Sequence, residues 1–387
     1  MKTRLFLLMF MILLPAAYAS GDEVGCLSAD SIPEVAAVSE QSANHARDSV
    51  FATLPWYSQL MENGFEIHDP RINYPRFPRL CLRVYDWGDR TFNSYDKDYV
   101  VGTGQNWKVM LKNYNWMTSY MMFFEKNQTL NIRSNIYQDL GAYICFMAVS
   151  VGYTAKVDNL IGEGRKTREN FSFSFTSSRF SANVSYWKTV GDTKITHFGD
   201  YNDGKSFTYD FDAVRMRTYN GELYYFFNHM KYSQAAAYSF SKYQLKSAGS
   251  WIAGAAFSHQ TLDMDFSSLP EEMKLHLPHL GSYYRFRYND YDVMGGYAHN
   301  WVLRPRKWLI NLTVLPSVGW RYSYQDSTDG KHNMFSTNLR AMLAGVYNHK
   351  SLFATLQARF DGHLYYNRNY TFFDSIESLS FIIGARF

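Results

Sequence analysis

"SLSFIIGARF", residues 378–387, alternates apolar and polar side chains up to the end of the sequence. Its apolar positions are Leu379, Phe381, Ile383, Ala385 and Phe387. The positions between them are polar, charged or glycine, with Ile382 as the exception. Successive side chains of a β-strand point to opposite faces, so the stretch predicts a strand with one apolar face and one polar face.

The aromatic last residue adds a second indication. A closing strand of this kind resembles the last strand of bacterial outer-membrane barrels, where the barrel-insertion machinery reads it as a signal. The resemblance implies that Phe387 is a membrane-insertion signal. It also implies two partners, the insertion machinery and the lipid of the outer membrane.

Alternation with a period of two recurs along most of the chain from about residue 107. In "ENFSFSFTSSRFSANVSYW" (169–187), two such runs flank a turn at Ser177-Ser178. Membrane barrels alternate in this way, so we predict an all-β fold, a transmembrane antiparallel up-and-down β-barrel of about 12 strands. A secreted β-sandwich is the competing interpretation. The other strands are expected at 116–125, 128–136, 141–153, 213–227, 247–258, 282–300, 308–321, 335–347, 352–363 and 378–387.

The connections between these strands sort by length. Short turns are expected at the periplasmic end and longer loops outside, as is usual in such barrels. The long segment 228–246 is an exception, because strand parity assigns it to the periplasmic end. The expected extracellular loops are 154–168, 191–212, 259–281, 323–334 and 366–375.

Three positions interrupt the pattern. Pro316 cannot donate a backbone hydrogen bond, so a bulge is expected there. A bulge is also expected at Asn289-Asp290, where the apolar residues change face. Asn220-Gly221 is a strong hairpin signal, but a turn there would break strand parity. We interpret it as an in-strand position or a bulge.

Residues 1–19 predict a cleaved secretory signal peptide. Lys2 and Arg4 precede an apolar run at 5–14, and Ala17-Tyr18-Ala19 offers small residues for cleavage. The run is too short for a membrane helix, which needs about 20 residues. The expected location is therefore the outer membrane, reached by export.

Residues 20–105 lack the alternation and are expected to form a short periplasmic N-terminal extension, with the barrel at 106–387. The polar, alanine-containing stretch 28–64 is a candidate for helix. Three prolines within 68–80 predict extended chain.

Charge and cysteine content exclude some classes of function. Without Lys2 and Arg4, the 39 basic residues fall to 37, against 35 acidic residues, and this balance argues against a nucleic-acid partner. Of the three cysteines, Cys26 and Cys81 could pair in an oxidising periplasm. Three free thiols, with Cys145, are the alternative.

No ligand motif is complete. "TFNSYDKDYVVGTGQNWK" (91–108) fails the calcium-loop pattern at its third ligand, and it lacks both the spacing of a phosphate loop and the third glycine of a dinucleotide fingerprint. We interpret it as a glycine turn before the first strand. His276-x-x-His279 lies in a predicted loop, where surface histidines are favoured over a metal site. No catalytic, cofactor-binding or metal residue is predicted.

Four charged residues are candidates for the barrel lumen: Arg340, Arg359, Asp361 and His363. Alternation places them inward on adjacent strands. One hypothesis is a cationic constriction that selects anions. The favoured alternative is an internal network of ion pairs that fills the lumen.

Two segments carry a resemblance to a known family: "YDWGDRTFNSYDKDYVVGTGQNWKV" (85–109) and "YYFFNHMKYSQAAAYSFSKYQLKSAGSWIAG" (224–254). They resemble domain-of-unknown-function family 4421 of exported Bacteroidota proteins, from about residue 80 to the end. The resemblance implies an outer-membrane β-barrel and no known site residues. It also marks 228–246 as characteristic, and our hypothesis is that this segment plugs the barrel mouth.

The polar inward faces favour a pore or small-solute transporter, although the solute is not identified by the sequence. A barrel-embedded enzyme acting on lipid or peptide is the alternative. A structural or assembly component of the cell envelope is a third class.

Overall fold

The computed structural model describes residues 51, 53–63, 69–92, 94–105, 107–125, 128–146, 149–157, 167–277, 280–324, 332–366 and 370–387. The chain divides into two compact units, residues 1–91 and residues 92–387. The predicted signal peptide and Cys26 lie outside the described residues.

The N-terminal unit contains two described helices, α3 (Trp56–Glu62) and α4 (Arg76–Phe92). The expectation of extended chain through 68–80 is wrong from Arg76 onward. Pro78 is the third residue of α4, where a backbone N–H would have no partner within the helix, so its ring is tolerated there. Cys81 is an exposed free thiol on α4. None of the helices in the described ranges is long and apolar enough to cross a membrane.

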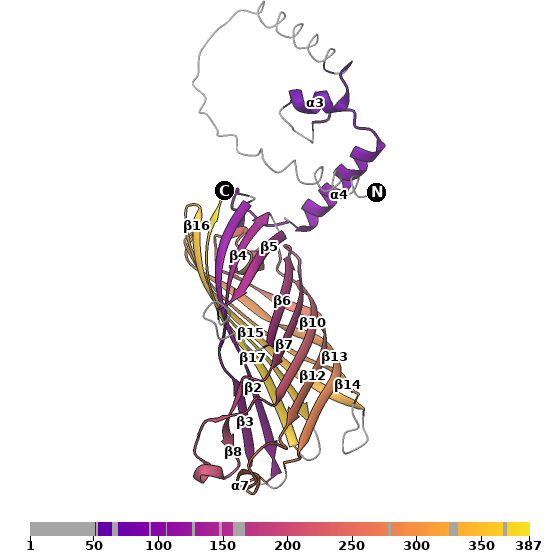
Figure 1. The fold of residues 1–387 in the computed structure, drawn as a ribbon. Coiled ribbons are helices and arrows are strands. Elements are labelled where there is room, and N and C mark those ends of the chain that lie inside the picture. The colour runs from indigo at the N-terminus through magenta and orange to yellow at the C-terminus, as the bar shows by residue number, and fades with distance from the viewer. Residues whose placement is uncertain are drawn as a thin grey trace, which may run out of the picture. The chain divides into compact units, whose positions relative to one another are not determined.

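Antiparallel strands make up most of residues 92–387 and wrap around a common interior (Figure 1). The wall contains β2 (Trp107–Phe124), β3 (Thr129–Ser134), β4 (Tyr137–Phe146), β5 (Val149–Lys156), β6 (Thr167–Thr176), β7 (Phe180–Val190), β8 (Thr193–Phe198), β9 (Tyr209–Asp210), β10 (Val214–Phe226), β12 (Ala248–Asp265), β13 (Tyr283–Arg304), β14 (Trp308–Ser323), β15 (Asn333–His349), β16 (Leu352–Tyr366) and β17 (Tyr370–Arg386). Shorter elements are β1 (Val100–Gly102), η3 (Tyr201–Gly204), α6 (Gln234–Tyr238), β11 (Lys242–Gln244) and α7 (Glu271–Lys274).

The last strand closes against the first. β17 pairs with β2 along its length, and Trp107 and Phe387 exchange backbone hydrogen bonds of 3.1 and 3.0 Å. We call this the C-terminal end of the barrel. The opposite end, which carries β3, β8 and α7 in Figure 1, is called the loop end.

The two halves of the barrel differ in strand number. β2 pairs with β4 toward the C-terminal end and with β3 toward the loop end. β3 pairs in turn with β8, a continuation of β7, and β8 pairs with β9, which leads into β10. The loop half is therefore a closed ring of ten strands: β2, β3, β8, β9 with the start of β10, and β12 to β17. In the C-terminal half, β4, β5, β6 and β7 replace β3 and β8, which gives twelve strands. The sequence also predicts about twelve, but it counts β3 among them and treats β4 and β5 as one strand.

One expected strand is in fact a hairpin. Residues 141–153 belong to β4 and β5, which pair with each other, as in Cys145↔Ser150. The segment is apolar on both faces, so alternation gave no indication of where it turns. All five expected loops are partly strand. The segment 191–212 contains β8 and β9, β12 extends to Asp265, and β17 begins at Tyr370. The ends of β5 and β6 reach into 154–168, and those of β14 and β15 reach into 323–334.

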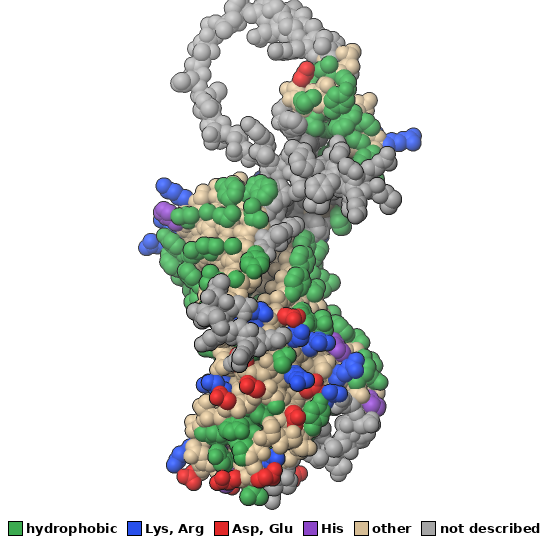
Figure 2. Space-filling view, viewed as in Figure 1, with side chains coloured by type: hydrophobic (Ala, Val, Ile, Leu, Met, Phe, Trp, Pro, Cys, Tyr) green, Lys and Arg blue, Asp and Glu red, His purple; other side chains and the backbone are tan. Residues whose placement is uncertain are grey.

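The bulge expected at Asn289-Asp290 is absent, because β13 keeps a continuous register with β12 through this point. Instead, the character of its two faces reverses. Toward the loop end, Arg287 points outward and Tyr288 is buried; toward the C-terminal end, Val293 points outward and Asp292 is buried. Figure 2 shows the same reversal, with apolar side chains over the C-terminal half and charged ones gathered over the loop half. A change of surrounding medium, from water to lipid, explains this reversal.

The other irregular positions also keep register. Pro316 lies opposite Leu339 of β15, and the pairing of β14 with β13 has the same register on both sides of it, so the expected bulge is wrong. Its neighbours across β13 are Gly295 and Gly296, which have no side chain to crowd the proline ring. Asn220 lies within an uninterrupted β10, as expected.

Candidate functional site

An aromatic core fills the loop half of the barrel. Its fully buried members include Tyr120, Phe286, Tyr288 and Phe372. The rings of Phe286 and Phe372 stack with centroids 4.3 Å apart. This half therefore has the packing of a water-soluble barrel, with apolar residues inside and charges outside.

The inserted segment, residues 228–246, fills the C-terminal end. Its helix α6 is buried along Gln234–Ala237, and the barrel wall holds its backbone carbonyls. The Asn300 amide donates to Ser233 O at 2.9 Å, and the Arg386 guanidinium donates to Phe240 O at 2.9 Å. Phe240 also packs on Phe353 of β16. The segment is thus part of the interior and is held by several strands.

The stretch before the first wall strand braces this inserted segment. β1 pairs with β11, Asp96 N donates to Met230 O at 2.9 Å, and Leu245 N donates to Tyr99 O at 2.7 Å. Burial raises the pKa of the Tyr95 phenol to about 12. The Asp96 carboxylate accepts from Asp98 N at 3.0 Å, a turn contact and no ligand arrangement. The two segments that carry the family resemblance therefore pack against each other.

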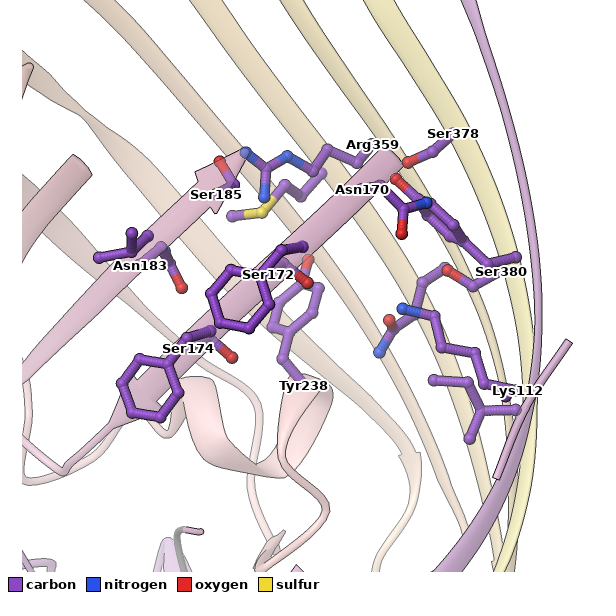
Figure 3. Close-up of a pocket in the computed structure, with 18 of the residues that line it drawn as sticks. Lys112, Asn170, Ser172, Ser174, Asn183, Ser185, Tyr238, Arg359, Ser378 and Ser380 are labelled. Carbon is purple, nitrogen blue, oxygen red and sulfur yellow. The ribbon is translucent and has the colours of Figure 1, made fainter. Parts of the chain in front are cut away.

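A polar cavity of about 330 Å³ lies between the aromatic core and the inserted segment. Figure 3 shows Lys112 from β2, Arg359 from β16 and Tyr238 from α6 converging on it. Hydroxyl and amide groups supply most of its other polar surface: Asn170, Ser172, Ser174, Asn183, Ser185, Gln234, Gln357, Ser378 and Ser380. Such groups bind a polar ligand without demanding a particular charge.

Predicted lumen residues form an ion-pair network at one side of the cavity. Asp361 accepts from Arg340 Nε at 2.5 Å and from Arg359 Nε at 2.6 Å. Arg340 also contacts Glu222, and Arg359 Nη2 lies 3.9 Å from the same carboxylate. Nη2 of Arg359 is buried and makes no hydrogen bond in the structure. His363 lies apart, 3.3 Å from Asp374, and does not line the cavity.

Lys112 is the cation without an ion-pair partner. Among the described residues, no carboxylate lies within ion-pair distance of it, and its ammonium rests over the Tyr114 ring at 4.5 Å. Asp139, which also lines the cavity, is engaged with Arg168 at 3.2 Å and with Asn170 at 2.7 Å. The charged side chains that line the cavity and their ion-pair partners comprise four cations and three anions. The cations are Lys112, Arg168, Arg340 and Arg359, and the anions are Asp139, Glu222 and Asp361.

Sequence reasoning missed Lys112, Asp139 and Glu222. Alternation could have assigned Glu222 to the lumen, because it shares a face of β10 with Thr218 and Asn220. The hairpin-like Asn220-Gly221 obscures this alternation. Contacts between side chains on opposite walls of the barrel leave no pattern in the local sequence, so they could not be predicted from it.

The histidine pair contributes no metal site in the described residues. His276 Nδ1 lies 3.0 Å from Asp200 Oδ1, and His279 falls outside the described ranges. Nowhere in those ranges do three or more His, Cys, Asp or Glu side chains gather as metal ligands.

The antiparallel strands wrapped around a common interior and the outward apolar belt define a transmembrane β-barrel. The chain belongs to the family described as "Domain of unknown function (DUF4421)", whose model matches residues 94–387. This confirms the resemblance noted in the sequence. Comparison with curated proteins finds no match.

Solved structures with a similar fold are distant. The outer-membrane protease OmpT of Escherichia coli is 10% identical, with 76% of this chain and 98% of that chain covered and a TM-score of 0.29. The Pseudomonas putida toluene transporter TodX is 8% identical, with 72% and 88% covered and a TM-score of 0.24. A bacterial polysaccharide outer-membrane secretin is 7% identical, with 73% and 99% covered and a TM-score of 0.28.

Proposed function

We propose that this protein is a substrate-specific transporter of the outer membrane that binds a small anionic solute in its central cavity. The observation that carries the proposal is Lys112, which has no ion-pair partner in the described residues. The other charges that line the cavity, Asp139, Arg359 and Asp361, are all paired, and hydroxyl and amide groups supply most of its remaining polar surface. A buried charge without a partner is costly, and a bound anion would relieve that cost.

The filled ends of the barrel support a transporter in preference to an open pore. The aromatic core occupies the loop half and the inserted segment occupies the C-terminal end. A solute that crosses the whole barrel must displace both of them. We place the C-terminal end toward the periplasm, because the short turns lie there, as in other barrels of this kind.

Uptake into proteoliposomes tests the proposal. Inorganic phosphate and glycerol phosphate are expected to enter faster than choline. Lys112→Met is expected to lower anion uptake about tenfold, equivalent to about 1.4 kcal/mol. The matched control is Lys188→Met on β7, because Lys188 pairs with Glu169 and does not line the cavity. Equal uptake of anions and choline would contradict the proposal.

Two other results would replace it. Hydrolysis of added phospholipid or peptide by the refolded protein would favour the barrel-embedded enzyme. Absence of all uptake, together with stable co-purification of another envelope protein, would favour a structural or assembly role.

A further inference from the structure

The wall has a seam between β5 and β6. In the described residues, β5 pairs with β4 alone and β6 pairs with β7 alone, so the hydrogen-bonded sheet ends at these two strands. Both strands belong to the C-terminal half, where the outward side chains are apolar.

The cavity reaches through this seam. On β6 its lining includes both faces of the strand, the inward Ser172 and Ser174 and the outward Phe171 and Phe173. Phe171 is 60% exposed on the outside of the barrel. Across the seam, Tyr143 and Thr154 of β4 and β5 complete the lining. A single space thus joins the polar interior to the apolar exterior.

Side chains limit the seam on the side toward the loop end. Arg168 donates to Gln138 O at 2.8 Å and pairs with Asp139, which also accepts from Asn170 at 2.7 Å. Lys156 Nζ reaches the Arg168 carbonyl from β5. These bonds join β6 to β4 and β5 where the barrel narrows, and the opening lies on the C-terminal side of them.

Unpaired strand edges are costly at membrane depth. Backbone N–H and C=O groups have no partner in hydrocarbon, and irregular backbone is tolerated there only where it lines a polar cavity or is buried in protein. The seam therefore opens a cavity lined by hydroxyl groups and Lys112 toward the apolar exterior, an arrangement that suits a molecule with a polar end and an apolar end.

We propose that the ligand of the cavity is an amphiphile with an anionic headgroup, which enters sideways from the membrane through the β5–β6 seam. The headgroup lies between Lys112 and the serines of β6 and β17, and the acyl chain passes Phe171 and Phe173 into lipid. The cavity volume of about 330 Å³ is at the lower end of the roughly 300–1000 Å³ typical of ligand sites, which fits a headgroup with its chains left outside. This inference rests on the anion site proposed above and adds the source and route of the anion.

Photo-crosslinking tests whether lipid enters the interior. A photo-reactive amino acid placed at Ser185, an inward residue that lines the cavity, is expected to form an adduct with phosphatidylglycerol in proteoliposomes. The same group placed at Tyr284, which packs on the aromatic core, is expected to form none. Retained heat-modifiable gel mobility shows that each variant is folded. Failure of the Ser185 variant to crosslink lipid overturns the lateral route.

Comparison of two lipids shows whether the anion comes from a lipid headgroup or from a free solute. Phosphatidylglycerol is expected to crosslink at Ser185 at least about tenfold more than phosphatidylcholine, and Lys112→Met is expected to remove this preference while Lys188→Met keeps it. Equal crosslinking of both lipids, or a preference that survives Lys112→Met, overturns the proposed headgroup site. If glycerol phosphate is transported but no lipid is crosslinked, the amphiphile inference fails and the transporter proposal stands.

Discussion

At the scale of the residue, several charges inside the barrel occur in hydrogen-bonded ion pairs, in contrast to Lys112. Arg321 and Asp290, both fully buried in the loop half, form a two-point contact with distances of 2.5 and 2.6 Å. The guanidinium also lies over the Tyr288 ring at 4.0 Å. Such a pair is costly to break, because removing one partner leaves the other charge buried and unpaired.

Asp290→Asn is expected to lower the free energy of unfolding by about 3–5 kcal/mol, the usual cost of breaking a buried pair. Urea titration of the protein in lipid vesicles, followed by tryptophan fluorescence, measures the loss. The double variant Asp290→Leu with Arg321→Met is expected to recover most of it. A single variant as stable as the parent would show that this pair is accessible to water.

Glu222→Gln is expected to strengthen anion binding about tenfold, because it removes one of the carboxylates that balance Arg340 and Arg359. Calorimetric titration with glycerol phosphate measures the affinity. The control is Glu169→Gln, an outward carboxylate paired with Lys188. Weaker binding by Glu222→Gln would mean that Glu222 serves mainly to position Arg340 and Arg359, and that its negative charge does not weaken anion binding.

At the scale of the element, the inserted segment and the stretch before β2 pack against each other and exchange backbone hydrogen bonds. The turns and glycines of 94–105 form β1, which pairs with β11 of the inserted segment. In β13, sequence patterning gave the strand correctly but misread its change of face as a bulge. Alternation reports only that two faces differ, and the identity of the apolar face depends on what surrounds the strand.

Deletion of residues 230–246, with two glycines as a link, is expected to leave the barrel folded. The Asn228 side chain donates to Gly249 O at 2.8 Å, so the ends of β10 and β12 are already joined there. A cysteine placed at Ser380 is expected to react faster with a water-soluble maleimide, because the cavity is then open at the C-terminal end. Ion conductance in planar bilayers is expected to stay low, since the aromatic core remains.

The deletion separates the two fillings. A large steady conductance of the deletion variant would show that the inserted segment is the main barrier to ions and that the aromatic core does not block them. Unchanged maleimide reactivity would show that the segment does not cover the cavity.

At the scale of the whole molecule, the barrel is built for two media. Along β10, the outward residues change from Arg215 and Arg217 to Leu223 and Tyr225, while the inward residues change from Met216 to Glu222. The C-terminal half, whose outer surface is apolar, has twelve strands, and the loop half has ten. The part of the barrel in lipid is therefore the wider part, and it contains the cavity.

Leu223→Arg is expected to cost about 2–4 kcal/mol of folding free energy in lipid vesicles, the usual cost of an arginine on the lipid face. The matched variant on the same strand and face is Arg217→Leu, in the loop half, where a surface change typically costs within about 0.5 kcal/mol. Reversible folding into vesicles, followed by urea titration, measures both. Equal effects of the two changes would contradict a membrane belt confined to the C-terminal half.

The sequence by itself indicated most of the strands, the barrel class and the family, because alternation and turn residues are local signals that do not depend on distant neighbours. It did not indicate the β4–β5 hairpin or the strands β8 and β9. It also placed Arg340 and Asp361 on adjacent strands, where they pair directly. Only the tertiary structure decided which halves face lipid and water, that β5 and β6 leave a seam, and that Lys112 and Arg359 line one cavity with Glu222 close to Arg359. These features depend on the closure of the sheet, which brings together strands far apart in the chain.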